Sequence, residues 1–261
     1  MNTLVFDIET VPDVELGRKL HDVPDLDDAA VAKIMQLKQR QARQSDVLPP
    51  HQQRVIAISG VMKSREGVRV FSLGDEQSGE RDLVQRFFDG LERYSPTLVS
   101  WNGSGFDLPV LGYRALRHGV SAARYWELGE NDREFRYNNY LSRYHWRHVD
   151  LMDVLSAYGA SGRASLENVS QLLGLPGKLG MSGADVWPAY RRGDLASIRN
   201  YCETDVLNTY LIFLRFQLLR GELDAKQHAY EVLQVDALLE QSDRPHLREF
   251  LAAWRSARHA D

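Results

Sequence analysis

The sequence predicts an α/β fold, and three observations support this. Runs rich in β-branched and aromatic residues indicate strands at residues 4–10, 54–62, 68–73 and 97–101. Apolar residues at helical spacing indicate helices at 29–43, 81–94 and 108–117. The longest helical pattern, 195–219, has Asp194 at its N-cap position and Gly221 just past its end. Strands interleaved with helices are typical of a sheet that is flanked by helices.

Composition allows one large domain, or one domain with a small appendage. The chain has 261 residues, of which 43% are hydrophobic and 26% charged, as in an ordinary globular protein. No repeat or low-complexity linker separates a second domain. The formal net charge of −4 argues against a protein that coats nucleic acid nonspecifically, although it leaves room for a local basic groove.

Cysteine usage and the N-terminus bear on the compartment. Cys202 is the single cysteine, which excludes an intramolecular disulfide and a cysteine-rich zinc site and fits a reducing compartment. The start Met1-Asn2-Thr3 lacks a basic region, and the apolar run after it is too short for a signal peptide or a membrane span. We therefore expect a cytoplasmic protein that has no membrane partner.

Two carboxylates interrupt the first predicted strand. In the run LVFDIET, Asp7 and Glu9 occupy alternate positions and therefore project from the same face. Two anions so close repel each other, and charge in a core strand needs a partner, so the pair predicts a site for hard divalent cations such as Mg²⁺ or Mn²⁺. The same spacing recurs at Asp13/Glu15 and Asp132/Glu134, outside any apolar strand, where surface acids are expected.

The middle of the chain supplies further elements. Residues 54–62 and 68–73, joined by the turn 64–67, predict an antiparallel meander with the first strand. The strand at 97–101 leads through a Gly-rich turn into the helix 108–117, which places Asp107 near the N-terminus of that helix. The sequence further predicts a short strand at 149–155 with Asp150 and Asp153, a helix at 165–173 capped by Ser165, and a mobile loop at 177–183.

Two segments have basic character. Residues 29–43 predict either a solvated insertion helix or a helix that overhangs a phosphate-binding site. Residues 133–148 carry four arginines against one glutamate, interleaved with Phe135, Tyr137, Tyr140, Tyr144 and Trp146. Cations and aromatic rings together are how single strands are held, although these rings could equally be core residues.

The long helix and the C-terminus complete the prediction. Tyr201 and Asp205 lie four residues apart, on one face of the helix 195–219. Residues 222–261 are charged and helical, with a second helix after Pro245, and we interpret them as a C-terminal cap or a partner surface.

Three segments resemble the motifs of a known family. FDIET at 6–10, WNGSGFD at 101–107 and YCETD at 201–205 are similar in order, spacing and chemistry to the Exo I, Exo II and Exo III motifs of the DEDD exonucleases. Tyr201 marks the DEDDy branch, and the chain most resembles the proofreading domain of family B DNA polymerases, in particular the standalone bacterial PolB-like 3′-5′ exonucleases. The resemblance covers residues 1–220, so we expect an exonuclease domain there and a C-terminal helical extension at 221–261.

The resemblance implies a fold, a metal centre and site residues. The fold is ribonuclease H-like, with a mixed five-stranded sheet whose first strand is central and whose acids gather at its end. Two Mg²⁺ or Mn²⁺ ions are implied, with Asp7 bridging both, Glu9 and Asp205 completing one site, and Asp107 supporting the other. The resemblance also places Thr10 beside the terminal nucleotide, and it makes Asn102 and Phe106 contacts to the strand near its 3′ end.

The implied activity is 3′-5′ hydrolysis of single-stranded nucleic acid, DNA being favoured, by a two-metal mechanism. Tyr201 is expected to orient the attacking water rather than remove its proton, because a phenol with a pKa of about 10 is a poor base at neutral pH. Two alternatives stay open: an exoribonuclease for short oligoribonucleotides, and a noncatalytic module that binds strand ends. No polymerase domain follows in this sequence, so proofreading in cis is not expected.

Overall fold

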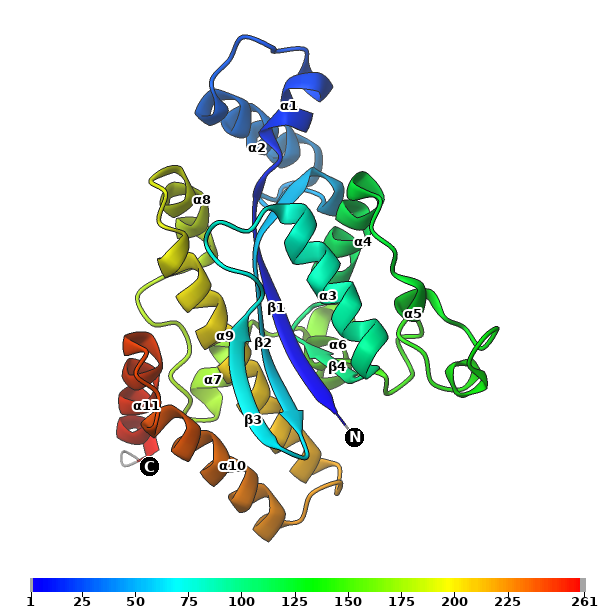
Figure 1. Ribbon diagram of the computed structural model, residues 1–261. Coiled ribbons are helices and arrows are strands. Elements are labelled where there is room, and N and C mark those ends of the chain that lie inside the picture. The colour runs from blue at the N-terminus through cyan, green and yellow to red at the C-terminus, as the bar shows by residue number, and fades with distance from the viewer. Residues whose placement is uncertain (1, 259–261) are drawn as a thin grey trace.

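The computed structural model describes residues 2–258, which form a mixed five-stranded sheet with helices on both faces (Figure 1). The sheet order is β3-β2-β1-β4-β5, with β1 in the centre. The strands are β1 (Thr3–Pro12), β2 (Gln53–Ser64), β3 (Gly67–Ser72), β4 (Thr97–Ser100) and β5 (His148–Asp150). β1, β2 and β3 are antiparallel, whereas β4 and β5 run parallel to β1. This confirms the predicted ribonuclease H-like sheet and its antiparallel meander.

Helices occupy most of the remaining chain. The α-helices are α1 (Val14–His21), α2 (Asp28–Arg43), α3 (Glu80–Tyr94), α4 (Asp107–His118), α5 (Ala123–Trp126), α6 (Leu151–Leu155), α7 (Leu166–Leu172), α8 (Gly183–Arg191), α9 (Leu195–Leu219), α10 (Ala225–Glu240) and α11 (Pro245–Arg258). Short 3₁₀ helices are η1 (Pro50–Gln52), η2 (Arg133–Arg136) and η3 (Ala160–Gly162). In the part of the chain that the structure describes, no helix is long and apolar enough to cross a membrane.

The two faces of β1 serve different helices. Leu4, Phe6 and Ile8 pack in a core with α3 and α4, as strand alternation requires. Val5 packs in the core around α9, and Val11 packs in a smaller cluster that also contains Tyr201 of α9. Asp7 and Glu9 share the parity of Val5 and Val11, so they belong to the face that α9 covers.

The register of β1 opens one of its edges where the acids lie. β2 pairs with β1 along its whole length, but β4 pairs only with residues 3–5. Past Val5 the other edge is therefore available to α4 and the turn before it. The pairing with β2 shifts between Glu9 and Thr10, and such irregularities re-aim side chains beside active sites.

The structure corrects the prediction of a strand at 149–155. The strand ends at Asp150, and residues 151–155 form α6. The reason is a helix cap: the Asp150 side chain accepts a hydrogen bond from the Asp153 amide, which turns the chain into a helix. Helices α1 and α8 were also not predicted, whereas Ser165 and Asp194 cap α7 and α9 as expected.

Residues 13–48 form a small helical unit beyond the end of β1, at the top of Figure 1. Val31 and Met35 of α2 pack with Leu48 in a separate apolar cluster. Gly17 of α1 lies so close to Met35 that an added Cβ would be 2.4 Å from its sulfur atom. The basic side chains of α2 are all exposed to solvent: Lys33, Lys38, Arg40 and Arg43.

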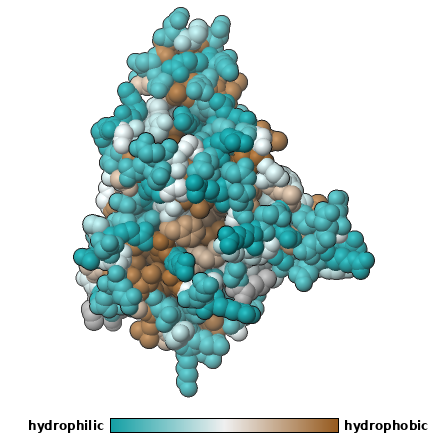
Figure 2. Space-filling view, viewed as in Figure 1, coloured by the Kyte–Doolittle hydropathy of each residue, from teal (hydrophilic) through white to brown (hydrophobic). Residues whose placement is uncertain are grey.

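The C-terminal helices pack on the same side of the sheet as α9. Val235 and Leu239 of α10 and Phe250 and Trp254 of α11 are buried in the α9 core. On the face of the sheet that carries α3, by contrast, β2 and β3 are incompletely covered (Figure 1). Figure 2 shows apolar side chains gathered there, in the lower half of the view. A groove of about 430 Å³ there is lined by residues of β2, β3 and α3.

Candidate active site

Three elements bring four acidic side chains together. Asp7 and Glu9 come from the middle of β1, and Asp107 is the first residue of α4. Asp205 lies near the middle of α9, four residues after Tyr201. The charges of Asp107, Glu9 and Asp205 all raise the pKa of Asp7, which places the four carboxylates within electrostatic reach of one another. The site residues expected from the sequence therefore converge.

Asp107 is attached directly to β1. Its Oδ1 accepts a hydrogen bond of 3.2 Å from the backbone amide of Ile8, between the two acids of the strand. That amide lies past the last residue of β1 that pairs with β4, so the carboxylate occupies the place that a longer β4 would take. The short length of β4 thus lets α4 approach β1 beside Asp7 and Glu9.

Asp150 shapes the turn that precedes Asp107. Its two carboxylate oxygens accept hydrogen bonds of 2.9 Å from the amides of Asn102 and Ser104. Asn102 has a φ of 65°, a left-handed conformation that asparagine tolerates better than most residues. Its carbonyl accepts from the amides of Gly105 and Phe106, which closes the turn. Asp150 was predicted only as an acid on a strand, and its role in this turn follows from the parallel pairing of β4 with β5.

α9 presents its residues to three different surroundings. Tyr201 and Asp205 face the acids of β1, and Cys202 is fully buried with its thiol 3.5 Å from the carbonyl oxygen of Asp7 and 3.7 Å from its Oδ2. Glu203 points the other way and binds Ser72, Arg244 and His246. Of the two acids in YCETD, the helical phase thus makes one a candidate ligand and the other a structural anchor.

Burial raises the pKa of every acid in the cluster, and mutual repulsion adds to the rise for Asp7 and Glu9. Desolvation is the largest cause for Asp7 and Glu9, whose pKa values lie well above their ordinary range, and the neighbouring carboxylates add to it. Desolvation raises the pKa of Asp107 to about 7, and the charge of Asp150 adds to that rise. Desolvation also raises the pKa of Asp205 to about 6, although Tyr201 and Lys178 oppose the rise.

None of these four carboxylates has a salt bridge within residues 2–258. The cation that reaches them is Lys178, whose charge lowers the pKa of both Glu9 and Asp205. Lys178 lies in the loop between α7 and α8, where the adjacent Gly177 is held by Asn208 of α9. Lys178 could not be identified from the sequence, because a lone lysine in a Gly-rich loop carries no periodic signal.

The donor set fits hard divalent cations. Ligand atoms of Asp7, Glu9 and Cys202 lie within 4.8 Å of one another. Asp205 Oδ1 is buried and has no hydrogen-bond partner, which leaves a carboxylate oxygen available for a ligand. Oxygen donors on a rigid strand and helix suit Mg²⁺ or Mn²⁺. Cys202 was predicted only as an unpaired cysteine, although its position next to Tyr201 in the motif could have indicated its proximity.

Tyr201 is buried beside Asp205. Desolvation, followed by the charges of Asp205, Glu9 and Asp7, raises the pKa of its phenol far above the ordinary value. The phenol is therefore protonated at neutral pH and can donate a hydrogen bond but cannot accept a proton as a base.

The three residues expected to contact the strand are close to the acids in the sequence. Thr10 follows Glu9 on β1, and its hydroxyl donates a 3.0 Å hydrogen bond to Gln53. Phe106 immediately precedes Asp107 and packs, partly buried, against the α3–α4 core. Asn102 is partly exposed at the start of the turn.

The arginine and aromatic segment 133–148 divides into buried and exposed residues. Phe135 and Tyr140 are core residues, and the Arg147 guanidinium lies 4.1 Å from the centre of the Phe135 ring. Arg143 forms an ion pair with Asp153. The exposed aromatic residues are Tyr137, Tyr144 and Trp146. The buried half of the segment therefore serves packing, and only the exposed half is available to a strand.

Two known DNA polymerases are similar to this chain. A DNA polymerase of Archaeoglobus fulgidus is 26% identical over 166 residues, which are 62% of this chain and 20% of the polymerase. The chain thus spans only a small part of that relative. A solved structure of the family B DNA polymerase from the hyperthermophilic archaeon Pyrobaculum calidifontis aligns with 92% of this chain and 28% of its own, at 18% identity and a TM-score of 0.46.

A family model matches residues 45–254, a range that contains Asp107, Tyr201 and Asp205 and begins after β1. Its description is "Predicted 3'-5' exonuclease related to the exonuclease domain of PolB". The match covers most of the chain, includes the second and third motifs, and confirms the resemblance to PolB-related exonucleases. This protein belongs to the family of predicted 3′-5′ exonucleases related to the exonuclease domain of PolB.

Proposed function

We propose that this protein is a 3′-5′ exonuclease that hydrolyses phosphodiester bonds from the 3′ end of single-stranded nucleic acid, with DNA as the favoured substrate. The observation that carries the proposal is the convergence of four carboxylates from β1, α4 and α9, none of which forms a salt bridge with any residue from 2 to 258. Buried anions are costly unless a cation joins them, so the cluster is built to bind one. Family membership supports the 3′-5′ polarity.

Two Mg²⁺ or Mn²⁺ ions fit the available donors. We propose that Asp7 is shared by both, that Glu9 and Asp205 hold one, and that Asp107 supports the other. Bound there, the ions would supply a nucleophile from water at neutral pH, neutralise charge on the phosphoryl oxygens and stabilise the leaving oxygen.

The chain's own residues would complete the chemistry. Tyr201, held protonated by its surroundings, donates a hydrogen bond that orients the attacking water beside Asp205. Lys178 offsets the negative charge at Glu9 and Asp205 and attracts the phosphate of the substrate. We propose that the terminal nucleotide is held by Thr10, Asn102 and Phe106.

We assign this chemistry to residues 1–220 and a supporting role to the extension that starts at residue 221. Arg244 immediately precedes α11, His246 lies in its first turn, and both contact Glu203 of α9. These bonds fix the far side of the helix that carries Tyr201 and Asp205. The extension would thus hold α9 in place rather than contact the substrate.

A labelled-strand assay tests the function. Oligonucleotides of single-stranded DNA, RNA and short oligoribonucleotides, labelled at the 5′ end, are incubated with Mg²⁺, Mn²⁺ or EDTA, and the product ladder is resolved over time. We expect progressive shortening from the 3′ end with either metal and none with EDTA. Asp205→Asn should abolish shortening, whereas the control Asp243→Asn, an exposed acid outside the cluster, should not.

The same assay separates the alternatives. Shortening of oligoribonucleotides alone would assign the exoribonuclease function instead. Binding of 3′ ends without shortening under every metal condition would assign a strand-end binding module. Cleavage of a circular single strand would contradict an exonuclease of either kind.

A further inference from the structure

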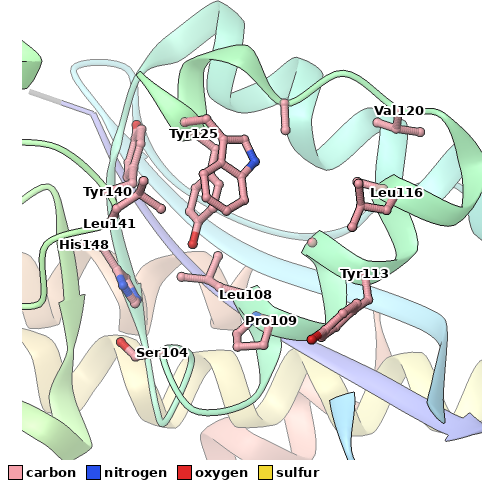
Figure 3. Close-up of a pocket in the computed structure, with 14 residues that line it drawn as sticks. Ser104, Leu108, Pro109, Tyr113, Leu116, Val120, Tyr125, Tyr140, Leu141 and His148 are labelled. Carbon is pink, nitrogen blue, oxygen red and sulfur yellow. The ribbon is translucent and has the colours of Figure 1, made fainter. Parts of the chain in front are cut away.

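A groove beside the proposed active site has no role in the chemistry described so far. It has a volume of about 500 Å³ and lies between α4 and the chain from residue 120 to 148. One wall is made by Leu108, Pro109 and Tyr113 of α4, and the facing wall by Tyr125, Trp126 and Tyr140 (Figure 3). This volume is within the range of about 300–1,000 Å³ that is typical of small-ligand sites. We call it the α4 groove.

The α4 groove is lined by residues that are adjacent in the sequence to the proposed catalytic residue Asp107. Leu108 and Pro109 directly follow Asp107, and Ser104, at the other end of the same turn, also lines the groove. Asp150 fixes the backbone of Ser104, as described above. The groove is thus connected to the acids through the first turn of α4 and the loop before it.

An unpartnered hydroxyl points into the groove. The Tyr125 side chain is only 8% exposed, and within residues 2–258 its hydroxyl makes no hydrogen bond. Figure 3 shows this hydroxyl directed toward Leu108 and the interior of the groove. The neighbouring Tyr140, by contrast, donates its hydroxyl to the Pro96 carbonyl at 2.7 Å. A hydroxyl that has no partner in the chain is available to bond the edge of a bound group.

Large aromatic surfaces stand at the rim. Trp126 is 59% exposed and Tyr113 is 49% exposed, and both line the groove. None of the residues that line the groove is an aspartate, glutamate, lysine or arginine. Its one titratable imidazole, His148, is bonded to Ser100, and desolvation lowers its pKa to about 4, so it is neutral. An apolar, aromatic and uncharged groove suits a planar, uncharged group rather than a phosphate or a metal ion.

Cations lie on the same segment as the facing wall. Arg133 and Arg136 are exposed, and neither forms an ion pair with any residue between 2 and 258. Both lie between Trp126 and Tyr140 in the chain. Unpaired guanidinium groups on the segment that supplies the facing wall of an uncharged groove match a ligand whose backbone is anionic and whose projecting groups are neutral rings.

We propose that the α4 groove binds one nucleobase of the substrate strand, on the 5′ side of the terminal nucleotide. The inference rests on the proposed exonuclease function and adds a subsite to it. The base stacks on Trp126 and Tyr113, its edge bonds to the Tyr125 hydroxyl, and Arg133 and Arg136 attract the adjoining phosphates.

A walk of abasic sites tests this subsite. Single-stranded DNA oligonucleotides that each lack one base, at successive positions from the 3′ end, are cleaved under single-turnover conditions by the wild-type protein. One internal position should be sensitive: loss of its base should slow removal of the terminal nucleotide by about 5- to 150-fold, the effect of losing one stacked base. Trp126→Ala should slow cleavage of the intact strand by a similar factor and should abolish the sensitivity at that position.

Two further variants keep the test specific. Tyr125→Phe removes only the hydroxyl and should give a smaller loss at the same position. Tyr230→Ala removes an exposed aromatic ring from α10 and should retain the wild-type pattern. A wild-type pattern without a sensitive internal position, or one that Trp126→Ala preserves, would overturn the subsite and leave the exonuclease function intact. Absence of 3′ shortening by the wild-type protein would contradict both.

Discussion

Buried carboxylates in this protein are of two kinds. Asp13 accepts a 2.6 Å hydrogen bond from Arg114, and Glu203 accepts bonds of 2.7 Å from Arg244 and 2.8 Å from His246. Burial acts to raise the pKa of both acids, but these bonds hold it below the ordinary value. In the candidate site, Glu9, Asp107 and Asp205 are buried to a similar degree and Asp7 is partly buried; these four acids have no such partner and have raised pKa values.

The difference teaches where a ligand is needed. The structural acids carry their counter-charge within the chain, so their ionised form stabilises the fold. The site acids face one another, and their ionised form destabilises the fold until a cation arrives from solution. Substitutions in the two groups should therefore have opposite consequences for stability and for activity.

The largest expected effect is on activity. Asp7→Asn should reduce 3′ hydrolysis by at least about 10³-fold, because it removes the carboxylate that the other three acids surround. The metal-free variant should be as stable as the wild type or more stable, because one source of repulsion is gone. Hydrolysis rates and thermal unfolding midpoints check the two parts. Undiminished hydrolysis by the purified variant in excess Mg²⁺ would break the comparison.

The converse effect is expected at Arg114. Arg114→Met should lower the free energy of unfolding by about 3–5 kcal/mol, because it leaves the buried Asp13 and Glu80 without their shared cation. Denaturant unfolding measures the change. The matched control is Arg69→Met, which removes an exposed ion pair with Glu66 and should change stability little. Equal effects of the two substitutions would show that the buried network does not stabilise the fold.

The pH dependence of stability should sharpen the contrast. Asp107 has a pKa raised from 3.8 to about 7, so between these values the folded state of the metal-free protein holds a proton that the unfolded state has lost. Its contribution therefore makes the free energy of unfolding fall as pH rises from about 4 to 7. Asp107→Asn should flatten that slope in EDTA, as denaturant unfolding at several pH values would show. A slope that this substitution leaves unchanged would place the raised pKa elsewhere.

The smallest effect concerns Tyr201. Tyr201→Phe should slow hydrolysis by about 10- to 100-fold, because it removes a hydrogen-bond donor beside the acids and leaves the acids themselves in place. The loss should appear in kcat while the metal dependence changes little. A loss as complete as that of Asp7→Asn would mean that the phenol has a larger part in the chemistry.

Much of this arrangement could be predicted from the sequence, because its signals are local. Alternation around Asp7 and Glu9 predicts their common face, and the spacing of Tyr201 and Asp205 predicts theirs. The roles of Asp150 and Lys178 could not be predicted, because each depends on segments far apart in the chain. A sequence also does not show which buried acid has an arginine nearby. Asp13 was expected to be a surface acid, but it is buried and bound by Arg114 of α4.

The motif resemblance predicted a mixed five-stranded sheet with its first strand in the centre, and the error in the strand at 149–155 lies where a helix cap decides the structure. Asp150 ends β5 and starts α6 through one hydrogen bond, whereas residues 149–155 have the apolar character of a strand. Likewise, the residue types in the segment 133–148 do not show which aromatic side chains are buried, as Phe135 is, and which are exposed, as Tyr144 is. Composition alone does not separate these cases.

Calorimetric titration of the metal-free protein with Mn²⁺ at pH 6.5 tests the central claim most directly. Because the pKa values of Asp107 and Asp205 are raised to about 7 and about 6, binding should release protons, and the measured heat should vary with the ionisation enthalpy of the buffer. Asp7→Asn should weaken the binding strongly, whereas Asp243→Asn should not. Absence of Mn²⁺ binding, or binding of equal strength to the wild type and Asp7→Asn, would contradict the account.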